Sequence, residues 1–179
     1  MIRKKSAFAA FVALVALLAL SACSGGGSVE ITLPASFIQG DAEQVIENAK
    51  SKGVSEAKIN EDGSVTYKMS KATHEKMMKE MKDEVAKSAR DMAGGEDFKS
   101  IKDVKYNDKL TEFTMIVDRE AYESSFDGFA ILGLGLQGML YQTFDGVPSD
   151  KVKVTINVKD EASGEVFHTV TYPDQFQNP

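Results

Sequence analysis

The 179-residue chain has a single cysteine, no tryptophan and only two histidines. One cysteine cannot form an internal disulfide, so a disulfide-stapled scaffold is excluded. Basic residues are also few, with 21 lysines and arginines against 27 acidic residues. Such a chain offers no basic face for the phosphates of nucleic acid, so we expect no nucleic-acid partner.

The two histidines leave few candidates for a catalytic base or a metal ligand. His74-Glu75 matches the start of the H-E-x-x-H zinc motif, but Met78 occupies the place of the second histidine. His168 falls in a strand-like alternating pattern, which favours a packed or edge side chain. The chain has no G-x-S-x-G nucleophile elbow. We therefore expect no metal, no cofactor and no catalytic residue that a motif identifies.

The N-terminal segment, residues 1–22, has the parts of an export signal. Basic residues 3–5 precede an apolar run, residues 7–20, and small residues follow it. A helix of that run would span about 21 Å, short of the ~30 Å hydrocarbon core of a bilayer. A cleaved signal is therefore favoured over a permanent membrane helix. The 157 residues after it contain 18 basic and 27 acidic residues, a formal charge of −9.

The sequence Leu20-Ser21-Ala22-Cys23 ends this segment and resembles the lipobox of bacterial lipoproteins. The resemblance implies that Cys23 carries a diacylglycerol and becomes the new N-terminus after cleavage. Two acyl chains give a stable anchor, whereas a single chain binds a membrane only marginally. The resemblance thus implies a lipid bilayer partner through acylated Cys23 and a place on the extracytoplasmic face of the cell membrane.

We interpret residues 23–28 as the lipidated cysteine with a short Gly/Ser tether, and residues 29–179 as a single domain. Periodicity and turn signals predict a strand (29–33), a helix (41–52), a hairpin (55–60 and 64–69), a long helix (70–92), a second hairpin (99–106 and 110–117), an apolar segment (119–144) and a last hairpin (152–158 and 166–172).

This order, β-α-ββ-α-ββ-α-ββ, predicts an α+β fold in two layers. Tight hairpins give antiparallel strands, and alternating strands bury only one face. We therefore expect one antiparallel sheet built from hairpins, with about three helices on one face. The polar tail from Pro173 is predicted to fray.

Residues 133–138 match the G-x-G-x-x-G pattern of dinucleotide-binding loops. That chemistry needs a strand directly before the glycines, whereas residues 124–132 are predicted to be helical. The favoured interpretation is a buried helix whose glycines allow a close approach to the sheet, with a break near residues 133–135 as a variant. A membrane-touching or ligand-lining role for residues 128–144 is the alternative.

The long helix carries a stripe of methionines and small apolar residues. Its members are Met77, Met78, Met81, Val85, Ala89 and Met92. Core packing is the favoured interpretation. A hydrophobic groove and a copper(I) site that joins His74 to Met78 are the alternatives, because thioethers are adaptable in shape and bind soft metals.

The body of the chain resembles small bacterial cell-surface lipoproteins of unknown function, through the lipobox and the plan of helices and hairpins. No activity is implied by that resemblance. The first hypothesis is a non-enzymatic domain that binds a protein or an apolar ligand. A cell-envelope hydrolase with a site that no motif reveals and a structural lipoprotein without a ligand site are the alternatives.

Overall fold

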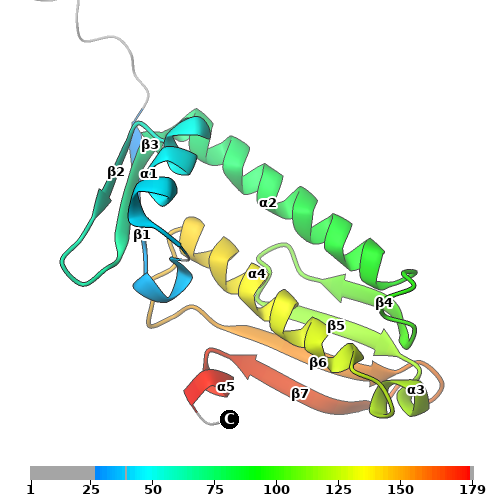
Figure 1. Ribbon diagram of the computed structural model, residues 1–179. Helices are drawn as coiled ribbons and strands as arrows, with labels where there is room; N and C mark the ends of the chain where they lie inside the picture. Colours follow the sequence, from blue (N-terminus) through cyan, green and yellow to red (C-terminus); the bar gives the residue numbers. More distant parts are fainter. Residues whose placement is uncertain (1–26, 39, 178–179) are drawn as a thin grey trace, which may run out of the picture.

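The computed structural model describes residues 27–38 and 40–177 (Figure 1). The predicted signal segment and Cys23 lie outside the described residues. The strands are β1 (Ser28–Leu33), β2 (Glu56–Ile59), β3 (Val65–Ser70), β4 (Ile101–Tyr106), β5 (Glu112–Val117), β6 (Val154–Asp160) and β7 (Val166–Tyr172). The helices are η1 (Ala35–Phe37), α1 (Ala42–Ser51), α2 (Lys71–Met92), α3 (Arg119–Glu123), η2 (Asp127–Phe129), α4 (Ala130–Phe144) and α5 (Asp174–Gln177).

The predicted α+β class and its two layers are confirmed. Helices α2 and α4 run side by side over one face of a four-stranded sheet with the order β4-β5-β6-β7 (Figure 1). A smaller sheet with the order β1-β3-β2 stands at one end of these helices, and α1 packs beside it. Buried side chains from both sheets and from the helices between them form one contiguous core.

The prediction of one fully antiparallel sheet is wrong in two respects. The strands form two sheets, and β5 pairs with β6 in parallel, with Phe113 opposite Ile156. The chain between these strands crosses the face of the sheet through α4 before it enters β6 (Figure 1). A crossover of this length brings the next strand back in the same direction, as parallel pairing requires.

The predicted hairpins and the start of the long helix follow local rules. In the first hairpin Asp62 accepts hydrogen bonds from the backbone N–H and the hydroxyl of Ser64, at 3.0 and 2.6 Å, which fixes the turn. Ser70 caps α2 by accepting from the backbone N–H of Thr73 at 3.1 Å.

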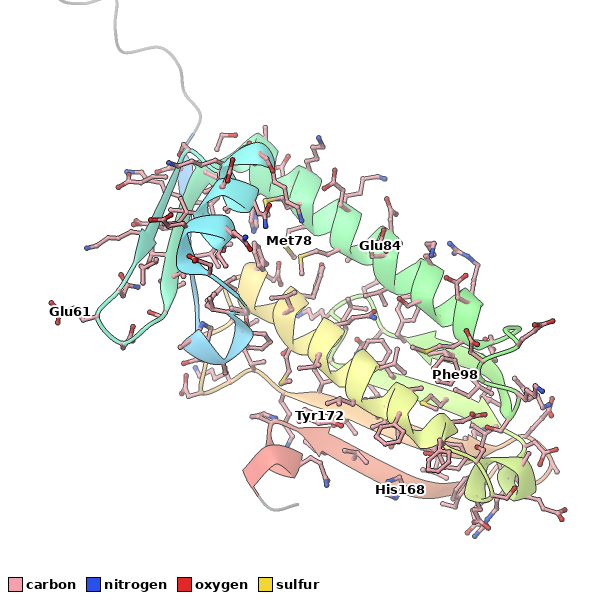
Figure 2. All side chains as sticks on the ribbon, viewed as in Figure 1. Glu61, Met78, Glu84, Phe98, His168 and Tyr172 are labelled. Atoms are coloured by element: carbon pink, nitrogen blue, oxygen red, sulfur yellow. The ribbon has the colours of Figure 1, made fainter. Side chains whose placement is uncertain are left out.

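Two of the three glycines in the G-x-G-x-x-G pattern lie where α4 meets the sheet. A Cβ atom on Gly135 would collide with the ring of Tyr172, which lies at the end of β7 beneath α4 (Figure 2). A Cβ on Gly138 would lie 2.7 Å from the carbonyl oxygen of Leu110. Gly133, by contrast, faces open space. The close-approach interpretation is therefore confirmed for Gly135 and Gly138 and is wrong for Gly133.

The break in the apolar segment lies earlier than predicted. Residues 124–132 were expected to be one helix, but α3 ends at Glu123 and the chain resumes as the short η2 at Asp127. Asp127 explains the break, because its buried carboxylate accepts from the backbone N–H and the hydroxyl of Ser100, at 2.9 and 2.6 Å. No helix of the described residues is both long and apolar enough to cross a membrane. The predicted frayed tail instead forms α5.

Candidate functional site

A groove between α1, α2 and α4 is lined largely by apolar side chains. It consists of two adjoining cavities of about 500 and 410 Å³, which we call the outer and the inner cavity. The two cavities share Lys52, Met77 and Leu140. Small-molecule sites in proteins have volumes of roughly 300–1,000 Å³ and are mostly apolar. The groove therefore has the size and the character of a ligand site.

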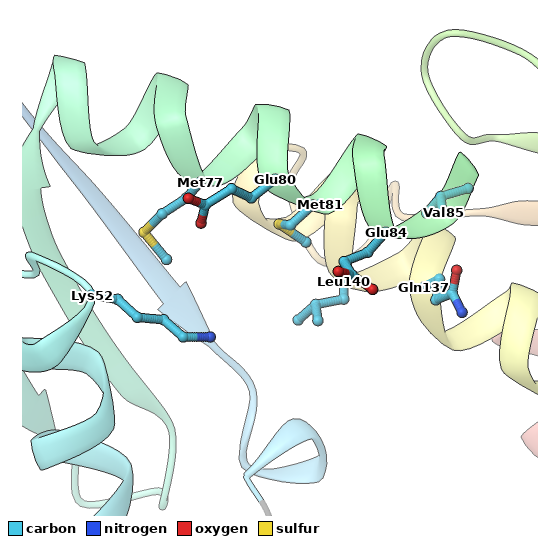
Figure 3. Close-up of a pocket in the computed structure, with 8 residues that line it drawn as sticks. All are labelled: Lys52, Met77, Glu80, Met81, Glu84, Val85, Gln137 and Leu140. Atoms are coloured by element: carbon cyan, nitrogen blue, oxygen red, sulfur yellow. The ribbon is translucent and has the colours of Figure 1, made fainter. Parts of the chain in front are cut away.

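The α2 wall of the outer cavity is built by helical spacing. Met77, Met81 and Val85 recur every four residues and so lie on one side of α2, facing the outer cavity (Figure 3). Met78, the next residue after Met77, is rotated by about 100° and is 8% exposed in the core. The methionine stripe thus divides between the core and a groove, and both of those interpretations hold in part.

The α4 wall contributes Leu140 and Gln137. The Gln137 amide donates from Nε2 to the hydroxyl of Ser88 on α2 at 3.2 Å. Its Oε1 atom is buried and accepts no hydrogen bond from any described residue. Leaving a buried polar atom unpaired costs about 1–3 kcal/mol, so this wall holds an acceptor whose partner the fold does not supply.

The inner cavity is the more apolar of the two. Its wall is formed mainly by apolar side chains from β1, η1, α1, β3 and α4, with Lys52 and Asn48 as the polar members: Leu33, Phe37, Ile38, Val45, Asn48, Ala49, Lys52, Val54, Tyr67, Met77, Leu140 and Phe144.

Tyr67 projects from β3 to this wall, with its ring centroid 6.4 Å from that of Phe144. The side chain is only 6% exposed, and none of the described residues gives its hydroxyl a hydrogen bond. Burial raises the pKa of Tyr67, so the hydroxyl keeps its proton over a wide pH range. Gln137 Oε1 is the one side-chain polar atom of the described residues that is both fully buried and unpaired, so the Tyr67 hydroxyl keeps some access to the cavity and can offer a donor there.

Lys52 is the cation of the groove. It follows α1 directly as the C-cap residue, and Gly53 after it has a φ of +91°, which turns the chain sharply. Its side chain extends toward the region shared by the two cavities (Figure 3). Among the described residues no carboxylate forms an ion pair with Lys52.

Two carboxylates stand on the α2 rim of the outer cavity, those of Glu80 and Glu84. Glu80 lies 3.7 Å from Lys76 in an exposed pair on the helix surface. Neither carboxylate lines the inner cavity. The groove is thus polarised, with two negative charges at its outer end and one positive charge at the boundary with the apolar inner end.

The residues that the copper alternative joins are not available to a metal in this arrangement. His74 donates from Nε2 to the backbone carbonyl of Phe144 at 2.7 Å, where it ties α2 to the end of α4. Met78 is buried in the core. Within the described ranges no group of three or more His, Cys, Asp and Glu side chains could hold a metal ion.

His168 lies on the edge strand β7, exposed, in a shallow depression that also includes Ser125 (Figure 2). The hydroxyl of Ser125 donates to the carbonyl of Tyr122 at 3.2 Å and accepts from the backbone N–H of Asp127. The Asp127 carboxylate is used by Ser100, as described above. The described residues therefore do not assemble a Ser-His-Asp relay around His168.

The same depression is flanked by exposed aromatic side chains. Phe126 and Phe129 are 85% and 71% exposed, and their rings stack with centroids 6.3 Å apart. Leu132 and Leu136 extend this apolar surface along α4. The membrane-touching alternative for residues 128–144 thus concerns only a few outward side chains, because most of α4 is buried.

Sequence reasoning found part of this site. The methionine stripe indicated the α2 wall, but Lys52, Tyr67 and Gln137 carry no motif, and the packing of separate elements places them along the two cavities of the groove. The chain matches no protein-family model, and no curated protein or solved structure shows significant similarity to it. The geometry of the groove is therefore the basis for a functional proposal.

Proposed function

We propose that the protein is a lipid-anchored lipoprotein on the extracytoplasmic face of a bacterial cell membrane, and that its folded part is a non-enzymatic module that binds an apolar ligand. The groove between α1, α2 and α4 is the observation that carries the binding function. The lipobox-like sequence that ends at Cys23 supports the anchor.

The chemistry of the groove favours binding over catalysis. Its wall is mostly aliphatic, aromatic and thioether side chains, and the histidines of the described residues lie elsewhere. Methionine side chains adapt to ligands of different shape because they are unbranched and polarisable. A structural lipoprotein without a ligand has no need of an apolar cavity of this size or of an unpaired buried acceptor in the groove wall.

The anchor is tested by the intact mass of the protein recovered from membranes of its host. We expect the mass of a chain that begins at Cys23 and carries a diacylglycerol, and we expect the Cys23→Ala variant to leave the membrane fraction. An unlipidated chain, with both forms free in the medium, would contradict the anchor.

The binding function is tested with a neutral photoreactive probe, a long-chain alcohol with a diazirine near its end. The membrane-purified protein is held in lipid nanodiscs, labelled and mapped by mass spectrometry. We expect adducts in peptides of the inner cavity, and loss of these adducts in Met77→Glu, which places a charge in the wall shared by both cavities. The double variant Phe126→Ser/Phe129→Ser is the control, because it removes exposed apolar surface outside the groove and should leave the adducts unchanged.

A further inference from the structure

We infer that the ligand of the groove is a long-chain carboxylate, with its chain in the inner cavity and its head group on Lys52. The inference deepens the proposed binding function and rests on it. The groove supplies an apolar chamber for the chain, a single cation at the mouth of that chamber and a hydroxyl that lacks a partner.

The apolar wall of the inner cavity indicates that the hydrocarbon chain of the ligand binds there. Phe37 of η1 and Ile38 directly after it line this cavity. Val45 of α1 and Phe144 of α4 complete its apolar wall. Each methylene group that leaves water for such a wall contributes about 0.8 kcal/mol, so a long chain gains most by lying fully inside. The outer cavity, with four polar residues among the eight that line it, is the poorer place for the chain.

The head group is assigned by charge. Lys52 is the only cationic side chain of the described residues that lines either cavity, and no described carboxylate forms an ion pair with it. A carboxylate matches one ammonium group in charge, whereas phosphate groups are usually bound by several cations or by the bidentate fork of arginine. Glu80 and Glu84 repel a second negative charge at the outer end of the groove. A ligand with one negative charge therefore suits Lys52 better than one with two.

Tyr67 supplies the second donor. Tyr67 is 6% exposed at the inner cavity wall, and its hydroxyl forms no hydrogen bond with the described residues, so it is free to donate into the cavity. A carboxylate oxygen accepts from both a hydroxyl and an ammonium group, and such charge-assisted hydrogen bonds are about twice as strong as neutral ones. An apolar ligand without an acceptor would not use this donor.

The test compares two photoreactive probes that differ only in the head group, a palmitic acid analogue and the corresponding alcohol, on the lipidated protein in nanodiscs. We expect the acid to label the inner cavity at about tenfold lower concentration than the alcohol. In Lys52→Met this preference should disappear while labelling by the alcohol persists. Lys58→Met, on the exposed face of β2 outside both cavities, is the matched control and should behave as wild type.

The two probes distinguish a wrong carboxylate assignment from the absence of any apolar binding site. Equal labelling by acid and alcohol, or an acid preference that survives Lys52→Met, would overturn the carboxylate assignment and leave an apolar binding site. If neither probe labels the inner cavity, the binding function itself fails. A Tyr67→Phe variant that keeps the fold and lowers the acid preference severalfold would support the second donor, and an unchanged preference would remove Tyr67 from the site.

Discussion

Gly138 of α4 packs directly against the carbonyl group of Leu110, which precedes β5. A Cβ atom at Gly138 would lie 2.7 Å from the Leu110 oxygen and 2.8 Å from Cγ2 of Val154 on β6. Both distances are shorter than van der Waals contact, and one of the two partners is backbone that cannot rotate away. This contact sets the distance of α4 from the sheet and thereby the position of Leu140 and Gln137 in the groove.

Substitution of this glycine should destabilise the protein. Gly138→Ala inserts a methyl group into a filled interface, and overpacking of this kind costs about 1–3 kcal/mol. Gly133→Ala is the matched control in the same helix, because its Cβ would face open space. There the better helix propensity of alanine should stabilise the protein by up to about 1 kcal/mol. Urea denaturation measures both changes, and equal midpoints for the two variants would refute the packing argument.

The two glutamines of α4 should differ in how much stability is lost when each is replaced by leucine. Gln142 is buried, donates to the carbonyl of Lys153 at 2.9 Å and accepts from its backbone N–H at 3.1 Å, so it ties α4 to the start of β6. Gln142→Leu leaves those backbone groups unpaired and should lower the unfolding free energy by about 2–3 kcal/mol.

Gln137 has the unpaired Oε1 atom described above, so Gln137→Leu removes an unmet acceptor at the loss of one hydrogen bond to Ser88. We expect its unfolding free energy to change by less than about 1 kcal/mol. Thermal melting curves of the two variants provide the comparison. A loss at Gln137 as large as that at Gln142 would show that the Oε1 atom has a partner in solution.

The turn between β6 and β7 gives a prediction for acid conditions. Hydrogen bonds from the hydroxyl of Ser163, at 2.6 Å, and from its backbone N–H lower the pKa of Asp160. Because the pKa is depressed in the folded protein, the stabilisation is complete above the unfolded pKa and is lost as the pH falls through the folded value. Ser163→Ala should move the pKa of Asp160 up toward its ordinary value, which NMR titration of the carboxyl resonance measures. An unchanged pKa would exclude the hydroxyl as its cause.

Methionine oxidation should distinguish the groove from the core. Met77 and Met81 line the outer cavity, whereas Met69 and Met115 are fully buried. Peroxide reaches accessible thioethers first, so we expect sulfoxide at Met77 and Met81 well before Met69 and Met115. Peptide mass spectrometry gives the order. Oxidation of all four at one rate would mean that the groove is closed or that the protein opens globally.

Local signals in the sequence predict much of the fold, but they do not predict which distant strands pair. The alternation of the last hairpin, the turn of the hairpin between residues 60 and 64 and the start of the long helix near residue 70 depend on near neighbours, and all three are found as predicted. The parallel pairing of β5 with β6 depends on where α4 crosses the sheet, which no single segment encodes.

Sequence patterns also do not predict which single residues line the groove. Met77 and Met78 are identical in type and adjacent in sequence, yet one lines a cavity and the other is core. Periodicity places both on the apolar side of α2 but does not tell which neighbour covers each. Lys52 and Tyr67 both line the inner cavity only because of how the elements around it pack, so their place in the site follows from the structure alone.

The most direct test of the ligand groove is a methionine-methyl NMR spectrum of the lipidated protein in nanodiscs, recorded with and without added palmitate. Binding in the groove predicts saturable shifts of the Met77 and Met81 signals, while Met69 and Met115 in the two sheets stay in place. Lys52→Met should need about tenfold more palmitate for the same shifts. A spectrum in which Met77 and Met81 do not move, or move no more than the buried methionines, would contradict the account.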